Sequence, residues 1–245
     1  MTTVDLKKAL LLCVYETYDE SVREFQTACT RHCVACCTNR VIATTAEAAL
    51  VLNYVEELGK KDLLNKALSE LPTAGGQHVI SMNALAEYCL GKQEPPGANG
   101  KWDTGPCQLM EGDECPVYQV RPLACRCMWS SQMCKAGGHA VMDPIMVSLA
   151  GVFQQIVEHV DSGGLYGNFA YLLAAMNDPK TAAEYRSGQV LNPTPFLVQT
   201  HPNPGFIVQP EHRRQIGGYL GRLWQREILG IPFKDALETV RKPGT

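Results

Sequence analysis

The stretch CTRHCVACC, residues 29–37, places four cysteines within nine positions and interrupts a chain whose other patterns are helical. Five more cysteines follow at residues 107–134, in the spacing Cys-x7-Cys-x9-Cys-x-Cys-x6-Cys. Two intervening residues, as between Cys33 and Cys36, form a loop short enough for two thiolates to bind one metal centre. Soft sulfur ligands suit tetrahedral zinc and the iron of iron–sulfur clusters. The sequence therefore predicts that both groups bind metal.

Apolar residues recur at helical spacing before, between and after the two cysteine groups. Residues 5–28 predict a first helix, and the capping-box spacing of Thr44 and Glu47 predicts the start of a second, which runs to Gly59. Further helices are expected at 63–71, 79–90, 143–162, 166–176, 179–187, 216–228 and 233–240. Residues 188–210 alternate prolines with short apolar runs and predict an ordered loop or a short hairpin. We expect a mainly α fold, with helices surrounding an irregular cysteine-rich metal-binding centre.

The chain has 245 residues, which could form one large domain or two small ones and can bury a core without the help of metal. With 45% hydrophobic and 19% charged residues, the composition is that of a globular protein and excludes a disordered or fibrous one. We treat residues 1–245 as a single domain. Its cysteine-cluster region spans about residues 29–135, and a helical C-terminal region spans about residues 140–245.

Charge and cysteine usage limit the partners and the compartment. Lys and Arg number 22 against 25 Asp and Glu, so the net charge of −3 provides no basic field, and we expect no nucleic-acid partner. The first apolar run, residues 9–15, is too short to cross a bilayer and precedes no cleavage site, so we expect neither export nor a membrane partner. The eleven cysteines cannot all pair internally, which favours metal binding in the cytoplasm. Cys13 and Cys89 lie among leucines and are expected to pack as core residues.

The second group contains CPVYQVRPLACR, residues 115–126, which closely resembles the signature of the YkgJ-like cysteine-cluster family of zinc- or iron-chelating proteins. That family also has an early cluster ending in two adjacent cysteines, as CVACC does at residues 33–37. The resemblance spans about residues 29–135 and implies eight metal ligands: Cys29, Cys33, Cys36, Cys37, Cys107, Cys115, Cys125 and Cys134. The gap from Cys29 to Cys33 holds three residues where the family commonly has two, which makes Cys29 the least secure of the early ligands.

The resemblance implies metal binding more firmly than it implies a reaction, since some family members are described as iron–sulfur proteins and others as flagellin lysine methylases. The leading hypothesis is an iron–sulfur protein, with a cluster of the 4Fe-4S type and a redox or enzymatic role, as in an oxidoreductase, on an unknown substrate. The alternative is a module whose structural zinc supports a helical surface for a protein partner. Methyl transfer is a third possibility that rests on analogy alone. The sequence assigns no catalytic residue and no electron partner.

Three details of the cysteine groups bear on the ligand set. Neighbouring side chains tend to diverge, so Cys36 and Cys37 are not expected to serve one mononuclear ion together. Cys127 could be a ligand, a spare thiol or a core residue. A metal with four thiolates carries net negative charge, and Arg121 and Arg126 bracket Cys125. We therefore expect the two arginines to bind the cofactor electrostatically.

Overall fold

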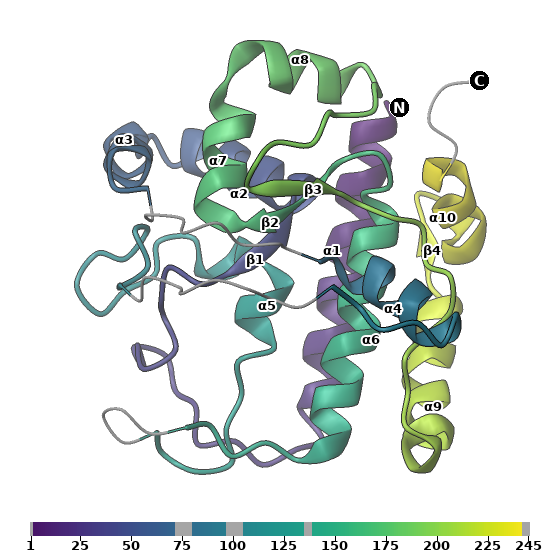
Figure 1. Cartoon of the computed structure of the whole chain (residues 1–245). Helices are drawn as coiled ribbons and strands as arrows, with labels where there is room; N and C mark the ends of the chain where they lie inside the picture. Colours follow the sequence, from purple (N-terminus) through teal and green to yellow (C-terminus); the bar gives the residue numbers. More distant parts are fainter. Residues whose placement is uncertain (1, 72–79, 97–104, 135–138, 242–245) are drawn as a thin grey trace.

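The computed structural model describes residues 2–71, 80–96, 105–134 and 139–241 (Figure 1). Ten α-helices and two small antiparallel sheets lie in these residues, so the expectation of a mainly α fold is confirmed. None of the helices in this part of the chain has the length and the apolar character that a bilayer crossing requires.

Two long helices lie side by side in the core, α1 (Thr3–Val22) and α6 (Pro144–Val160) (Figure 1). The ring of Tyr18 on α1 packs edge-on against the ring of Phe153 on α6, with centroids 5.3 Å apart. The first helix begins at a capping box, and the second begins with a proline at its first position after an aspartate cap, which are both favourable helix starts. The apolar faces of the two helices bury each other.

The first helix is shorter than the predicted 5–28, because it ends at Val22. Phe25 then packs edge-on against Trp129, with ring centroids 6.4 Å apart. The Ala28 amide donates to the Ser130 carbonyl oxygen at 2.9 Å. These contacts to a distant segment replace the helical hydrogen bonds that the local pattern predicted.

The remaining helices pack around α1 and α6. Their bounds are α2 (Thr45–Glu57), α3 (Lys61–Ser69), α4 (Met82–Leu90), α5 (Leu123–Arg126), α7 (Phe169–Asn177), α8 (Pro179–Arg186), α9 (Arg213–Trp224) and α10 (Phe233–Arg241), with 3-10 turns at Tyr118–Val120 and Pro210–His212. The predicted capping box of Thr44 and Glu47 does start α2. Helices α9 and α10 pack against α1, so the C-terminal region shares the core that the N-terminal helix forms (Figure 1).

A three-stranded antiparallel sheet, which the sequence did not predict as such, joins three distant segments. Its order is β1 (Ile42–Thr44), β2 (Leu165–Asn168) and β3 (Leu197–Gln199). The helix expected from residue 166 therefore begins only at Phe169, after the strand. Within the proline-rich segment, β3 adds to β2 as a third strand. Since β1 directly follows the first cysteine group, the sheet fixes the chain at the end of that group.

A second, two-stranded sheet replaces the end of one predicted helix. The apolar pattern predicts a helix over residues 216–228, but Ile228 lies in a strand. This strand, β4 (Glu227–Ile228), pairs with β5 (Ile231–Pro232). Leu229 and Gly230 adopt positive φ angles of 53° and 80°, as the turn of a tight hairpin requires. The hairpin leads directly into α10.

Buried carboxylates on and after α6 tie the other helices to it. Asp161 Oδ1 accepts hydrogen bonds from Lys7 Nζ at 3.2 Å and from the Tyr185 hydroxyl at 2.7 Å. Glu158 accepts hydrogen bonds from the amides of Asn83 and His201, both at 2.7 Å. Both carboxylates are 0% exposed, so these bonds replace the water that burial removes.

Candidate metal centre

The two cysteine-rich segments lie side by side, as expected. The Cys107 amide donates to the Cys37 carbonyl oxygen at 3.0 Å, and the Asn39 amide donates to the Gly105 carbonyl oxygen at the same distance. The Gly105 amide in turn donates to Asn39 Oδ1 at 3.1 Å. The backbone therefore holds the end of the first group against the start of the second.

Four cysteines from these segments come together, and we call them the inner thiol group: Cys37, Cys107, Cys115 and Cys125. The thiols of Cys107, Cys115 and Cys125 lie close enough to Cys37 that a negative charge on any of them opposes ionisation of Cys37. Burial raises the pKa of the Cys125 thiol, and the charges of Cys107 and Cys115 raise it further. Burial is also the main cause of the raised pKa values of Cys107 and Cys115.

Cys36 lies beside the inner thiol group, at its exposed edge. Its thiol is hydrogen-bonded to Cys37, which raises the pKa of Cys36 and lowers the pKa of Cys37. The Cys36 and Cys37 thiols thus lie close together, and the expectation that they do not serve one mononuclear ion stays a prediction. Cys37 is the member of the pair that faces the other inner thiols.

The other motif cysteines lie farther out. Cys33 lines a hollow of about 40 Å³ together with Cys37 and Cys115. Cys29 is exposed, with its Sγ atom 3.9 Å from the Ser130 carbonyl oxygen, and Cys134 is half-buried.

The inner thiols fit a soft metal by their chemistry. Thiols whose pKa is raised by burial stay protonated at neutral pH, and a soft cation is the partner that converts them to thiolates. No group of three or more His, Cys, Asp or Glu side chains in the described part of the chain is arranged to hold a metal ion as it stands. Binding would therefore require these thiols to turn toward a common centre.

Three cysteines outside the motif test the distinction between ligand and core residue. Cys127 is buried among apolar residues beside Tyr18 and Gln154, and burial raises its pKa to about 12, so it is a core residue. Cys13 packs against the core, as expected. The expectation for Cys89 is wrong, because α4 buries Asn83 and Ala86 and leaves Cys89 exposed.

Arg121 lies beside the inner thiol group. Its charge partly offsets the effect of burial on the pKa of Cys115 and of Cys125. Its guanidinium stacks on the Tyr118 ring at 3.7 Å from the centroid and donates to the Tyr118 carbonyl oxygen at 2.8 Å. This position is consistent with the expected electrostatic role.

Arg126 points elsewhere. Its guanidinium forms an ion pair with Asp19 and lies 4.3 Å from the centre of the Tyr15 ring. It also donates to the carbonyl oxygens of Gln119 and Arg121. The contacts with Asp19 and Tyr15 fasten α5 to α1 and give Arg126 a structural role, while its expected cofactor contact stays a prediction.

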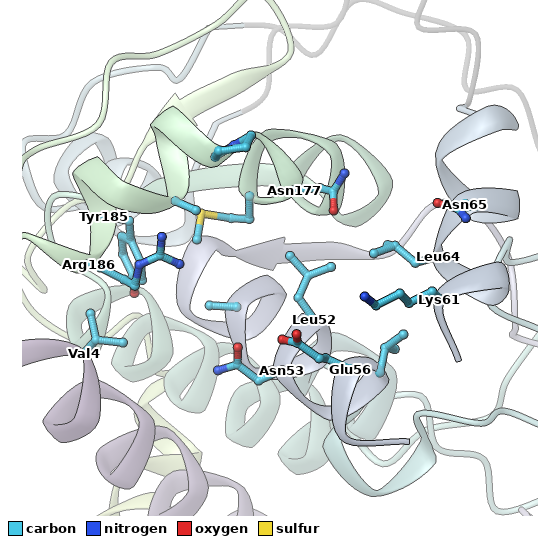
Figure 2. Close-up of a pocket in the computed structure, with 15 residues that line it drawn as sticks. Val4, Leu52, Asn53, Glu56, Lys61, Leu64, Asn65, Asn177, Tyr185 and Arg186 are labelled. Atoms are coloured by element: carbon cyan, nitrogen blue, oxygen red, sulfur yellow. The ribbon is translucent and has the colours of Figure 1, made fainter. Parts of the chain in front are cut away.

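A larger cavity lies away from the cysteines. It has a volume of about 480 Å³ and is bounded by α2, α3, α7 and α8 (Figure 2). Its wall carries Glu56, Lys61 and Arg186 but no cysteine, as Figure 2 shows. No sequence pattern predicted this cavity, since its polar residues come from separate helices and form no motif. The cavity is therefore separate from the candidate metal centre.

Sequence reasoning also missed a residue next to the inner thiols. Glu47 was expected to cap α2, but its carboxylate also accepts a hydrogen bond from the Leu123 amide at 2.7 Å. Only its capping-box spacing could have drawn attention to it. The bond connects residues 76 positions apart in the chain.

Comparison with known proteins gives one match. Residues 28–141 match the model of the CxxCxxCC family, which is described as "Putative zinc- or iron-chelating domain". No curated protein and no solved structure matches the chain. The matched region contains all eight motif cysteines and Arg121, and its family agrees with the cysteine-cluster resemblance found in the sequence. Residues 28–141, a little under half of the chain, are therefore similar to the zinc- or iron-chelating domain of the CxxCxxCC family.

Proposed function

We propose that this protein binds an iron–sulfur cluster through the inner thiol group and takes part in a redox reaction. The observation that carries the proposal is the meeting of Cys37 with Cys107, Cys115 and Cys125, which come from two segments of the chain. Four cysteine thiolates are the usual ligand set of a 4Fe-4S cluster. When bound, such a cluster supplies one-electron transfer.

The surroundings of the inner thiols support a negatively charged centre. A cluster with four thiolates carries net negative charge, which is costly to bury without a compensating cation. Arg121 is the cation whose charge reaches Cys36, Cys115 and Cys125. Its stacking on Tyr118 holds the guanidinium in place. Arg121 would therefore stabilise the loaded site.

The family signature has more cysteines than one metal centre uses. One tetrahedral zinc and one 4Fe-4S cluster each use four ligands, whereas the signature covers eight. Cys29, Cys33, Cys36 and Cys134 remain predicted ligands, and Cys33 and Cys36 lie nearest to the inner thiol group. The odd number of cysteines also supports a cytoplasmic, reducing location.

Structural zinc is the second candidate, and the size of the hollow favours it. The hollow beside Cys33, Cys37 and Cys115 holds about 40 Å³, which suits a single ion better than a cubane cluster. In this case the metal would stabilise the fold, and the helical surface would bind a protein partner. Methyl transfer has only the family analogy in its favour.

Metal and sulfide analysis of the full chain, purified without oxygen, separates the two candidates. The iron–sulfur proposal expects a coloured protein that contains iron and acid-labile sulfide in equal amounts. Stoichiometric zinc without sulfide would reject this proposal and support the structural module. A Cys37→Ala and Cys125→Ala double variant, which removes one inner thiol from each segment, should lose the metal in either case.

A further inference from the structure

The carboxylate of Glu47 reaches from the start of α2 to the cysteine signature. Its Oε1 atom accepts hydrogen bonds from the Tyr15 hydroxyl at 2.8 Å and from the Leu123 amide at 2.7 Å. Its Oε2 atom accepts a hydrogen bond from the Thr44 amide at 2.8 Å. Only 2% of Glu47 is exposed. One buried side chain thus joins α1, α2 and α5.

The short helix α5 depends on such a partner. It has four residues and begins after Pro122, with no side-chain cap of its own. The amides of a first helical turn have no acceptor within their helix. Leu123 is 1% exposed, so water cannot replace the missing acceptor. Cys125 follows two residues later on the same turn, and its position therefore depends on the bond from Leu123 to Glu47.

A second anchor lies on the other side of Cys125. The Arg126 guanidinium is paired with Asp19 and stacked on the ring of Tyr15, whose hydroxyl binds Glu47. The residues on either side of Cys125 are thus fastened to the same part of α1. This arrangement restricts the turn that carries the Cys125 thiol.

We propose that Glu47 is a positioning residue of the metal centre, which holds the turn carrying Cys125 against the other inner thiols. The inference rests on the proposed metal binding and adds to it a residue outside the cysteine motif. Residues that orient metal ligands through hydrogen bonds affect metal affinity almost as strongly as some ligands do.

Charge and positioning have opposite effects at Glu47, and this difference makes the proposal testable. Burial is the main cause of the raised pKa of Cys125, and the negative charge of Glu47 raises it further. Removing that charge alone would therefore favour the thiolate and strengthen metal binding. Removing the hydrogen bond to Leu123 would free the turn and weaken metal binding. The sign of the change separates the two roles.

The test is a titration of the full chain with Co²⁺ in the absence of oxygen, followed by thiolate-to-cobalt charge-transfer absorption. Glu47→Asp keeps the charge but draws the acceptor away from the Leu123 amide, whereas Glu47→Gln removes the charge and keeps one side-chain oxygen as an acceptor. Glu158→Asp is the matched control, because Glu158 is also fully buried and also accepts two backbone hydrogen bonds. Its partners Asn83 and His201 lie in α4 and after β3, which carry no inner thiol. Thermal unfolding is recorded for each variant.

The proposal expects Co²⁺ affinity about 10- to 100-fold lower in Glu47→Asp, and no more than about twofold lower than the wild type in Glu47→Gln and Glu158→Asp. Unchanged binding by folded Glu47→Asp would overturn it. Equal weakening in Glu158→Asp would also overturn it, because any shortened buried carboxylate would then suffice. If Glu47→Asp does not fold, a tenfold weakening in folded Glu47→Gln, which keeps the acceptor, overturns it. A wild-type protein without charge-transfer absorption would instead overturn the metal-binding function on which the inference rests.

Discussion

The Cys107 amide donates a hydrogen bond to the Cys37 carbonyl oxygen at 3.0 Å, so two motif cysteines seventy positions apart are backbone neighbours. An isolated antiparallel β-bridge between Thr38 and Pro106 lies next to this hydrogen bond. A thiol from the first segment is thereby held next to thiols from the second. The site depends on this contact more than on the spacing within either segment.

The separation of inner thiols from other cysteines leads to the first prediction. Cys125→Ala should lose metal, because Cys125 belongs to the inner thiol group. Cys89→Ala should keep it, because Cys89 is exposed on α4. Metal per chain, measured after anaerobic purification, compares the two. Equal loss in both variants, with folding intact, would show that the inner thiol group is not the metal site.

Cys127→Ala should keep the metal but lose stability. Its thiol is packed in the core beside Tyr18 and Gln154. We expect a loss of about 1 kcal/mol in the free energy of unfolding, from the deleted sulfur and the small cavity it leaves. Chemical unfolding and metal analysis of the same preparation check both parts. Metal loss in a stable variant would make Cys127 a ligand.

The sequence predicted features that depend on local spacing. Thr44 and Glu47 are three residues apart, and a capping box needs no information beyond that turn. The same sequence could not predict the bond from Leu123 to Glu47, because that bond depends on how α5 packs against α2. The cysteines and the helix start were therefore predictable, whereas the positioning of Cys125 was not.

Two wrong expectations have a shared physical cause. Cys89 was assigned to a buried face by its leucine neighbours, but α4 buries Asn83, whose side-chain amide donates to the Gln155 and His201 carbonyl oxygens. The segment Leu165–Asn168 reads as helical, but it pairs with strands on both sides. In each case, hydrogen bonds to distant residues override the local apolar pattern.

Gly167 provides a test of the three-stranded sheet. A Cβ atom at this position would lie 2.7 Å from Leu197 Cδ2 and 2.8 Å from the Phe196 carbonyl oxygen, which is too close for any side chain. Gly167→Ala should therefore push β3 away from β2 and cost about 1–3 kcal/mol in the free energy of unfolding. Gly217→Ala is the control, because a Cβ there meets nothing within 4 Å. Equal stability of both variants in urea unfolding would contradict the strand pairing.

Glu158 should make stability depend on pH. Burial raises its pKa above the ordinary value of 4.5, although hydrogen bonds from Ser81 and two backbone amides oppose this. The folded protein then keeps the proton at pH values where the unfolded chain has lost it. The contribution of Glu158 to the free energy of unfolding is therefore greatest below about pH 4.5 and falls as the pH rises to the raised pKa. The total fall is about 1.4 kcal/mol for each unit by which the folded-state pKa exceeds the unfolded-state pKa.

The variant Glu158→Gln isolates this effect, because it removes the titrating carboxylate. The difference in unfolding free energy, wild type minus variant, should fall as pH rises above about 4.5 and then level off. His201 lies beside Glu158, to which its amide donates, and 3.9 Å from Glu87, so the profile is repeated in His201→Gln. A difference that stays constant across the range, or that grows with pH, would contradict the raised pKa.

The last prediction compares Arg121 and Arg126, which bracket Cys125 but point in different directions. Reduction adds an electron to the cluster, so a nearby positive charge favours the reduced state, and Arg121→Gln should lower the reduction potential. At an effective dielectric of about 20 and a separation of about 8 Å, one charge contributes about 2 kcal/mol, or about 90 mV. Solvent and salt reduce this to a few tens of millivolts.

Arg126→Gln should change the potential less than Arg121→Gln does, because the charge of Arg126 is already compensated by Asp19. It should instead destabilise the fold by about 2 kcal/mol, through the loss of charged hydrogen bonds to Asp19 on α1 and to the Gln119 carbonyl oxygen. Anaerobic redox titrations at low and high salt, together with chemical unfolding, measure both quantities in both variants. If Arg126→Gln shifts the potential as much as Arg121→Gln, with the cluster retained, its charge acts on the cluster in spite of Asp19. If neither variant shifts it, Arg121 does not face the metal, and the cluster must lie on another side of the inner thiol group.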